Sequence, residues 1–215
     1  MESEILKTPW MEMTVREFQS ALASSSPTPG GGTAAAISLG QAAALTCMVA
    51  DLTMGKEKWQ SGWDVAEKSA ILAVSMLTRA GQLADDDSDS FDAVMDSFKL
   101  PKQSDEEIES RRTAIRNATL QAAVVPLETA RLAHNLLQHL PDLAKFGNGN
   151  AVSDVGVAGL LASAACKGAL FNVDINLASI PEEMGSDLAK EASELQESCR
   201  VLSRSVMDEV RARLT

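Results

Sequence analysis

Residues 24–36 combine two prolines, three consecutive glycines and a run of alanines, in the order Ser-Ser-Ser-Pro-Thr-Pro-Gly-Gly-Gly-Thr-Ala-Ala-Ala. Proline fixes φ and glycine adopts backbone geometries closed to other residues, so the stretch predicts a bare turn that leads into a helix. The first N–H groups of such a helix have no partner within it and can bind an anionic or polar ligand. An ordinary connection between helices with a glycine-rich tip is the alternative interpretation.

Carboxylates are concentrated in a second stretch, residues 85–109, which holds ten Asp and Glu side chains against two lysines. Four of them, Asp85, Asp86, Asp87 and Asp89, are expected at the end of a helix. A carboxyl group that points into a pocket beside other carboxylates has its pKa raised by desolvation and like-charge repulsion, which suits a general acid. A solvated acidic loop is the alternative for each of them.

A second glycine-rich turn, Phe146-Gly-Asn-Gly-Asn150, also precedes a helix of small residues. The polar side chains that flank this helix are candidates for orienting or binding a ligand: Asn148, Asn150, Asp154, Asn172 and Asn176. Asparagines in a turn and an aspartate in the first turn of a helix are also explained as turn formers and caps.

Other kinds of site are not indicated. The two histidines, His134 and His139, have no metal-ligand spacing, and the acidic stretch lacks the Asp-x-Asp-x-Asp-Gly order of a calcium loop. The three glycines do not follow a strand and no Gly-Lys-Ser/Thr is present, so a nucleotide-binding loop is not indicated. Three widely spaced cysteines imply no disulfide framework. The remaining chemistry is that of carboxylates, amides and backbone N–H groups, without a metal.

The net charge of −11 argues against a nucleic-acid partner, whose phosphates require a basic surface. Residues 110–134 are locally basic, with Arg111, Arg112, Arg116 and Arg131 against one glutamate. A cationic patch of this kind attracts an anionic substrate. Salt bridges to the acidic stretch just before it are the alternative.

The N-terminus lacks a basic region followed by an apolar one, so no signal peptide is expected. Residues 34–50 carry no charge, but they are mostly Ala, Ser, Gly and Thr, and are expected to fall short of the length and apolarity of a membrane span. A cytoplasmic protein without a membrane partner is therefore expected.

The elements that must position these groups are helical. Aromatic residues make up 4% of the chain and tyrosine is absent, which favours closely packed helices of small residues. No strand-like alternation of useful length is present. We predict an all-α fold, a single-domain multi-helix bundle over residues 1–215 with long Ala/Gly-rich central helices. The expected helices cover about residues 14–23, 33–53, 64–84, 91–98, 104–124, 127–140, 152–171 and 181–214.

Local signals support these boundaries. Thr14 with Glu17 and Ser104 with Glu107 form capping boxes, and Pro126 is expected to end or kink a helix. The glycines within residues 152–171 each cost about 1 kcal/mol relative to alanine. Tight packing against residues 33–53 is expected to offset that cost.

Several blocks together resemble the cyclodeaminase/cyclohydrolase family. The resemblance begins with Ser25-Ser-Pro-Thr-Pro-Gly-Gly-Gly-Thr33 and Met48-Val-Ala-Asp-Leu-Thr-Met-Gly-Lys56. It continues through Asp87-Ser-Asp-Ser-Phe91, Leu100-Pro-Lys102, Arg111 to Leu127 and Gly147-Asn-Gly-Asn150, and closes with Ser153-Asp-Val-Gly-Val157 and residues 168–177. Trp59, where relatives commonly have tyrosine, and Gly149, where a larger residue is common, depart from the pattern.

The family includes formiminotetrahydrofolate cyclodeaminase, alone or fused to a formiminotransferase, and methenyltetrahydrofolate cyclohydrolase. The resemblance implies an all-α fold, usually a homodimer, and an enzyme that forms or opens 5,10-methenyltetrahydrofolate by acid/base catalysis. Between the two reactions the sequence does not decide. The substrate is a tetrahydrofolate derivative, with or without a polyglutamate tail, and no further cofactor is implied. A non-catalytic folate-binding protein and a helical oligomerisation module are the alternatives.

The resemblance also suggests roles for residues. Asp87 is the expected proton-transfer group, Asp85 its support, and Asp154 with Asn150 the orienting groups. The glycines are expected to approach the pterin or the benzoyl-glutamate, and the cations to hold the glutamate tail. The full set of expected substrate-binding residues is Ser26, Pro29, Gly30, Gly31, Gly32, Thr33, Lys56, Lys102, Arg111, Asn148, Asn150, Asn172 and Asn176. We expect the two glycine-rich turns to meet at one pocket.

Overall fold

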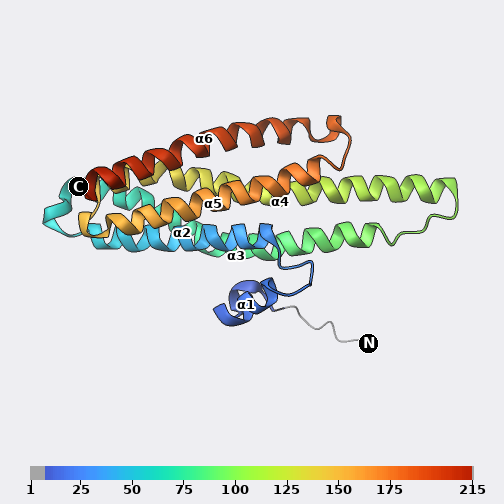
Figure 1. Ribbon diagram of the computed structural model, residues 1–215, viewed down its shortest axis with the longest axis horizontal. Helices are drawn as coiled ribbons and strands as arrows, with labels where there is room; N and C mark the ends of the chain where they lie inside the picture. Colours follow the sequence, from blue (N-terminus) through green and yellow to red (C-terminus); the bar gives the residue numbers. More distant parts are fainter. Residues whose placement is uncertain (1–7, 215) are drawn as a thin grey trace.

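The structure of the protein, a computed structural model, describes residues 8–214 (Figure 1). These residues form helices joined by short connections and contain no strand, which confirms the all-α prediction. In chain order the elements are η1 (Trp10–Glu12), α1 (Val15–Leu22), α2 (Gly31–Thr53), η2 (Glu57–Gly62), α3 (Trp63–Ser97), α4 (Asp105–Phe146), η3 (Gly149–Ala151), α5 (Val152–Leu177) and α6 (Glu182–Leu214).

The long helices lie side by side (Figure 1). α2 packs between α3 and α5, α4 packs against α3 and α5 on the other side, and α6 covers α4 and α5. The far ends of α3 and α4 extend beyond the other helices. The short α1 lies outside the row of long helices, below α3 in this view, and its Phe18 packs against a small cluster that includes Leu83 of α3. Two of the long helices, α2 and α5, carry the alanine and glycine residues predicted for the centre.

The core combines many buried alanines with a few larger side chains, among them Leu39, Met76 and Leu136. Small residues allow the helix axes to approach closely. A Cβ atom on Gly168 of α5 would lie 3.5 Å from Cβ of Ala35 on α2, so the expected close packing of these two helices is confirmed there. Gly159 of the same helix instead faces α6, where an added Cβ would lie 2.8 Å from Cγ1 of Val206.

Two helical stretches, Gly31–Thr53 and Gly149–Leu177, are long and apolar enough to cross a membrane by length and composition alone. The expectation that the first of them falls short is therefore wrong. Both stretches belong to the middle of the bundle, and 56% of the most apolar window of each is buried inside the protein. Burial of this kind gives the core helices of a bundle the same composition as a membrane span.

The acidic stretch does not end a helix as predicted. The predicted helices at residues 64–84 and 91–98 and the acidic segment between them form one helix, α3, which runs without interruption over 35 residues and ends at Ser97. Aspartate and serine have weak helix propensities, but tertiary contacts override propensity where each side chain has a partner. The candidate carboxylates therefore lie in the interior of a helix.

Pro126 does not end a helix either, because α4 continues through it to Phe146. A proline within a helix has no N–H to give to the carbonyl group four residues earlier. That carbonyl group belongs to Ala122, and it accepts a hydrogen bond of 2.8 Å from Nδ2 of Asn176 on α5. The neighbouring helix supplies the donor that the proline lacks, so the two predicted helices are one.

The local signals at helix starts agree better with the structure. Both capping boxes are formed, at Thr14 with Glu17 and at Ser104 with Glu107. α2 begins at Gly31, two residues before the predicted start, and Gly30 is its N-cap. Gly55, just after its end, has a φ of 73°, a conformation that favours glycine.

Candidate active site

Three consecutive aspartates in α3 point to three different neighbours. Successive residues of a helix are rotated by about 100°, so adjacent side chains cannot share one direction. Oδ1 of Asp85 accepts a hydrogen bond of 2.9 Å from the backbone N–H of Trp10. Asp86 pairs with Arg79 at 3.2 Å, and Asp87 points to the first turn of α2. The helix thus separates carboxylates that the sequence presents as one cluster.

Asp87 caps α2 from another helix. Oδ2 of Asp87 accepts a hydrogen bond of 3.0 Å from Oγ1 of Thr33, and the backbone N–H of Thr33 also donates to this carboxylate. Gly30, the N-cap residue of α2, has no side chain that can accept such a bond. The first N–H groups of a helix have no partner within it, and a carboxylate there also interacts favourably with the helix dipole.

Gly32 is required by this arrangement. A Cβ atom added to Gly32 would collide with the carboxylate of Asp87, whereas one added to Gly31 would meet its nearest neighbour, Nδ2 of Asn172, only at 3.9 Å. The glycine-rich turn therefore brings bare backbone against Asp87. Asn172 of α5 borders the same turn, and its Nδ2 donates to the carbonyl group of Gly168.

Burial raises the pKa of Asp87, and the hydrogen bonds from Thr33 lower it by less. The carboxyl group is half-buried and close to uncharged backbone rather than to a cation. A carboxyl group with a raised pKa exchanges a proton closer to neutral pH than an ordinary surface aspartate does. Among the predicted carboxylates, Asp87 therefore has the properties expected of a general acid or base.

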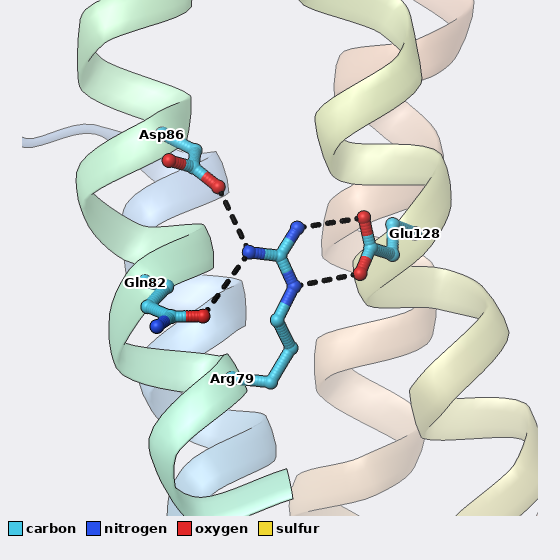
Figure 2. A network of polar contacts seen from close by, with 4 residues as sticks. All are labelled: Arg79, Gln82, Asp86 and Glu128. Atoms are coloured by element: carbon cyan, nitrogen blue, oxygen red, sulfur yellow. Dashed lines mark hydrogen bonds and ion pairs between the residues drawn. The ribbon is translucent and has the colours of Figure 1, made fainter.

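Asp86 has a different environment (Figure 2). Nη1 of Arg79 donates to Asp86. Nε and Nη2 of Arg79 donate to the carboxylate of Glu128 on α4, at 2.7 and 2.8 Å. Gln82 accepts a further bond from Nη1 of Arg79 at 3.3 Å. The bond from Arg79 lowers the pKa of Glu128. This network compensates the charge of Asp86 and fixes α3 against α4, on a side of α3 away from Asp87.

The second glycine-rich turn lies at the opposite end of α2. The backbone N–H of Asn148 donates to Oγ1 of Thr53, and its Nδ2 donates to the carbonyl group of Leu52, both at 2.9 Å. α2 has 23 residues and is about 34 Å long. α5 starts where α2 ends, so the loops that precede the two helices lie at opposite ends. The expectation that the two turns meet at one pocket is wrong within a single chain.

The polar groups of this second end have structural partners. Oδ1 of Asn148 accepts from the N–H of Asn150, and Asp154 lies in the first turn of α5. Lys56 is exposed just after α2. Within one chain, Asn150, Asp154 and Lys56 are too far from Asp87 to orient it or to share a substrate with it.

The two departures from the family pattern are neighbours at this end. A Cβ atom on Gly149 would lie 3.0 Å from Cη2 of Trp59 and 2.7 Å from Nη2 of Arg213. Arg213 lies over the ring of Trp59 at 5.3 Å and donates to the carbonyl groups of Ala144 and Gly147. Because Gly149 has no side chain, the ring of Trp59 and the guanidinium of Arg213 fit beside it.

Three other predicted binding residues lie near the first turn of α2 or contribute to structure. Ser26 is exposed and its N–H donates to Oγ of Ser24. Pro29 is buried and follows a cis peptide bond. Asn176 uses its amide on Ala122, as described above, which explains its presence without a ligand.

Lys102 and Arg111 lie at the protruding end of α3 and α4. Arg111 donates with Nε and Nη2 to the carbonyl group of Phe98, at 3.3 and 3.0 Å, and lies over its ring. From Asp87 to the end of α3 is ten residues, or about 15 Å. Other arginines of the basic stretch form ion pairs. Arg112 pairs with Glu109 of the acidic stretch, as the alternative interpretation predicted, whereas Arg131 pairs with Glu191 of α6.

Trp10 and Ser88 were not predicted as part of this region. Nε1 of Trp10 donates to Oγ of Ser88, which lies 3.3 Å from Oγ1 of Thr33. No local pattern marks these contacts, because they join residues 78 and 55 positions apart. Within residues 8–214, no group of three or more His, Cys, Asp or Glu side chains is arranged to hold a metal ion.

Comparison with known proteins gives the family. The profile of the formiminotransferase-cyclodeaminase family matches residues 14–194. The chain belongs to this family. The resemblance found in the sequence is thereby confirmed.

Relatives within the formiminotransferase-cyclodeaminase family include proteins of two lengths. The methenyltetrahydrofolate cyclohydrolase of Methylorubrum extorquens is 37% identical over 206 residues, which cover 94% of this chain and 97% of that protein. The formimidoyltransferase-cyclodeaminase of Rattus norvegicus is 32% identical over 84% of this chain, which spans only 33% of that longer protein. The crystal structure of formiminotetrahydrofolate cyclodeaminase from Thermotoga maritima superposes with a TM-score of 0.84 at 28% identity, covering 95% of this chain and 99% of that one.

Proposed function

We propose that this protein is a folate one-carbon enzyme that forms or opens the 5,10-methenyl bridge of tetrahydrofolate, with Asp87 as the proton-transfer group. The observation that carries the proposal is the half-buried carboxyl group of Asp87, with its raised pKa, against the glycine-rich first turn of α2. The named relatives act on methenyltetrahydrofolate or are cyclodeaminases.

The chemistry requires such a group. In cyclodeamination, N10 of 5-formiminotetrahydrofolate attacks the formimino carbon, and ammonia leaves the resulting tetrahedral centre. In cyclohydrolysis, water adds to the methenyl carbon, and a ring nitrogen leaves a similar centre. A nitrogen leaves readily only when it is protonated, so both reactions need a positioned acid that can also act as a base. Asp87 would supply the proton, and the bare backbone at Gly31 and Gly32 would allow the substrate to approach it closely.

Of the two reactions, cyclohydrolysis has the stronger support. The cyclohydrolase of Methylorubrum extorquens matches this chain over nearly its full length at 37% identity. Both reactions are additions and eliminations with proton transfer, so they need no redox cofactor. The fused relatives suggest a formiminotransferase as a partner if cyclodeamination is the reaction.

The test compares two substrates and two aspartates of one helix. Purified protein is mixed with 5,10-methenyltetrahydrofolate and the loss of its near-ultraviolet absorbance is followed against the spontaneous rate. A parallel assay offers 5-formiminotetrahydrofolate and measures ammonia. We expect acceleration in at least one assay, and a loss of about 10²- to 10⁴-fold in kcat for Asp87→Asn. Asp89→Asn, an exposed aspartate two residues further along α3, should keep its rate.

Two results would contradict this proposal. Near-normal turnover of Asp87→Asn would remove Asp87 as the proton-transfer group. Tight binding of both folates without acceleration in either assay would support the non-catalytic folate-binding alternative instead.

We also propose a homodimer, formed by the outward faces of α2 and α5. Phe171 and Ile175 on α5 are 68% and 66% exposed, and Met48 and Leu52 on α2 are exposed beside a single charged residue, Asp51. Large apolar side chains exposed on two adjacent helices are typical of an interaction surface. A two-fold axis that lies in this face and crosses the helices would set the copies antiparallel.

The antiparallel arrangement would bring a cation to a carboxylate. Lys56 follows the last turn of α2, and Asp87 lies at its first turn, so each copy would bring its Lys56 to the acidic end of the other. Leu160→Glu, in the middle of the α5 face, should give a monomer by light scattering, whereas Val74→Glu, equally exposed on α3, should remain dimeric. A dimeric Leu160→Glu would exclude this face.

The glutamate tail of the substrate is proposed to lie along α3 toward Lys102 and Arg111, at the far end of that helix, which is about 15 Å from Asp87. Lys102→Ala should then raise KM for a polyglutamylated substrate more than for a monoglutamate.

A cytoplasmic location is also proposed. Fractionation of cells that produce the protein tests this location.

A further inference from the structure

We propose that Trp10 is a positioning residue for Asp87, through a chain of hydrogen bonds that begins at its indole N–H and ends at the carboxylate. The inference rests on the proposed function for the role of Asp87 in the reaction. It concerns a residue outside the long helices, in the short element η1.

The chain has three links. Nε1 of Trp10 donates to Oγ of Ser88 at 3.0 Å, Oγ of Ser88 lies 3.3 Å from Oγ1 of Thr33, and Oγ1 of Thr33 donates to Oδ2 of Asp87 at 3.0 Å. An indole N–H only donates and an ionised carboxylate only accepts. Both hydroxyl groups must therefore donate in the same direction, toward Asp87, and the two ends of the chain fix the position of every proton in it.

Burial strengthens this chain. Trp10 is 8% exposed, and Ser88 and Thr33 are fully buried, so no water competes for the hydroxyl groups. In a low-dielectric surrounding, successive hydrogen bonds polarise one another and each becomes stronger. The indole N–H therefore acts on Asp87 through two hydroxyl groups, and supports the carboxylate form against the cost of its burial.

Trp10 also holds α3 on the other side of Asp87. Its backbone N–H donates to Oδ1 of Asp85, two residues before Asp87, while its ring binds Ser88, one residue after. The ring packs edge-on against Phe18 of α1 at 6.3 Å and lies in an apolar cluster with Leu83. One residue thus holds α3 on both sides of Asp87, and with it the direction in which Asp87 points.

The charged groups around Asp87 have other partners. Asp85 accepts from Trp10, and Asp86 faces Arg79 and, beyond it, Glu128 of α4. α2 brings Thr33 and the backbone of Gly32 to Asp87, α5 brings the uncharged Asn172 to the same turn, and the acidic residue of η1 is Glu12. Hydrogen bonding by Thr33, and through it by Trp10, is therefore the main influence that opposes burial.

The experiment removes the indole N–H and keeps the ring. In Trp10→Phe we expect kcat to fall about fivefold with little change in KM, as for the loss of one hydrogen bond. The limb of the pH profile that Asp87 controls should move to higher pH, whether the acid or the base form is active. Ser88→Ala interrupts the chain closer to Asp87 and should move the limb further in the same direction.

Trp63→Phe is the matched control. Nε1 of Trp63 donates to the carbonyl group of Thr53 at 3.1 Å, at the opposite end of α2. This variant loses a comparable indole bond and should leave the pH profile unchanged. An equal shift in both variants, or no shift in Trp10→Phe and Ser88→Ala, would overturn the proposal.

A second readout does not depend on activity. The carboxyl carbon of Asp87, assigned by comparison with Asp87→Asn, is titrated by NMR in each variant. If the wild type accelerates neither reaction, the proposed function fails, and this titration still decides the inference. If Trp10→Phe does not fold, Ser88→Ala carries the test in both measurements.

Discussion

The first and last turns of α2 are stabilised by different chemical groups. At the first turn a carboxylate from α3, Asp87, accepts from Thr33. At the last turn an uncharged amide, that of Asn148, donates to Leu52, and the adjacent backbone N–H donates to Thr53. Both ends have a glycine-rich connection and a buried threonine close to a polar side chain. The amide has its hydrogen bonds satisfied at little cost, whereas the carboxylate retains a raised pKa and can still exchange a proton.

This difference shows why similar sequence patterns can have different roles. A helix C-terminus offers carbonyl groups, which an amide or a cation satisfies. A helix N-terminus offers N–H groups, which attract an anion, and burial of that carboxyl group raises its pKa toward the range in which it can exchange a proton. The direction of α2 therefore decides which of its two ends can serve proton transfer.

The largest expected effect on catalysis comes from substitutions of the two adjacent glycines in the first turn of α2. In Gly32→Ala the new methyl group collides with the carboxylate of Asp87, whereas in Gly31→Ala it has room. We expect Gly32→Ala to lower kcat/KM by about 10²-fold, because a displaced catalytic group loses that much. Gly31→Ala should lose less than Gly32→Ala. Steady-state kinetics of both variants checks this, and equal losses would show that Asp87 does not need its present position.

A smaller effect is expected from the two threonines, each changed to the isosteric valine. Thr53→Val leaves the N–H of Asn148 without its acceptor and should cost about 1–3 kcal/mol in the free energy of unfolding, with an unchanged pH profile. Thr33→Val removes a direct bond to Asp87 and should move the pH profile to higher pH. Urea unfolding and pH–rate profiles of both variants distinguish the role of the first turn of α2 in proton transfer from the role of its last turn in stability. A shifted profile in Thr53→Val would remove the distinction between them.

The smallest effect is on stability, through Asp87 itself. Its pKa is raised in the folded protein, so the folded state binds this proton more tightly than the unfolded chain does. The carboxyl group therefore contributes most below the ordinary aspartate pKa, and stability is lost as pH rises from there through the raised pKa. Asp87→Asn should be more stable relative to wild type at neutral pH than at pH values near 4. Thermal unfolding at both pH values measures this, and a reversed order would mean that hydrogen bonding outweighs burial.

Much of the fold could be predicted from short-range patterns. Capping boxes at Thr14 and Ser104 depend on residues three positions apart, and the structure has both. The glycines at the start of α2 and the absence of strand alternation are equally local. The interruption predicted at Asp85 and the end predicted at Pro126 were wrong, because a distant partner stabilises the helix in each place. For Pro126 that partner is Asn176, fifty residues away.

The candidate site also has a part that local patterns predicted and a part that they did not. Asp87 and the glycines were found from their residue types and from the family pattern. Their grouping with Asn150 and Asp154 was wrong within one chain, because the antiparallel course of α2 and α5 separates the loops that precede them. Trp10 was missed, since nothing near residue 10 indicates that its indole meets Ser88.

The sequence by itself determined an all-helical chain, the helix starts that have capping boxes, its family, and a small set of groups able to transfer protons. These follow from backbone preferences and side-chain chemistry, which act over a few residues. Only the tertiary structure decided which aspartate is buried, which turn lies against it and which hydrogen bonds reach it. Those properties depend on the direction in which each helix side chain points and on the neighbour it meets there, and that neighbour comes from a distant part of the chain.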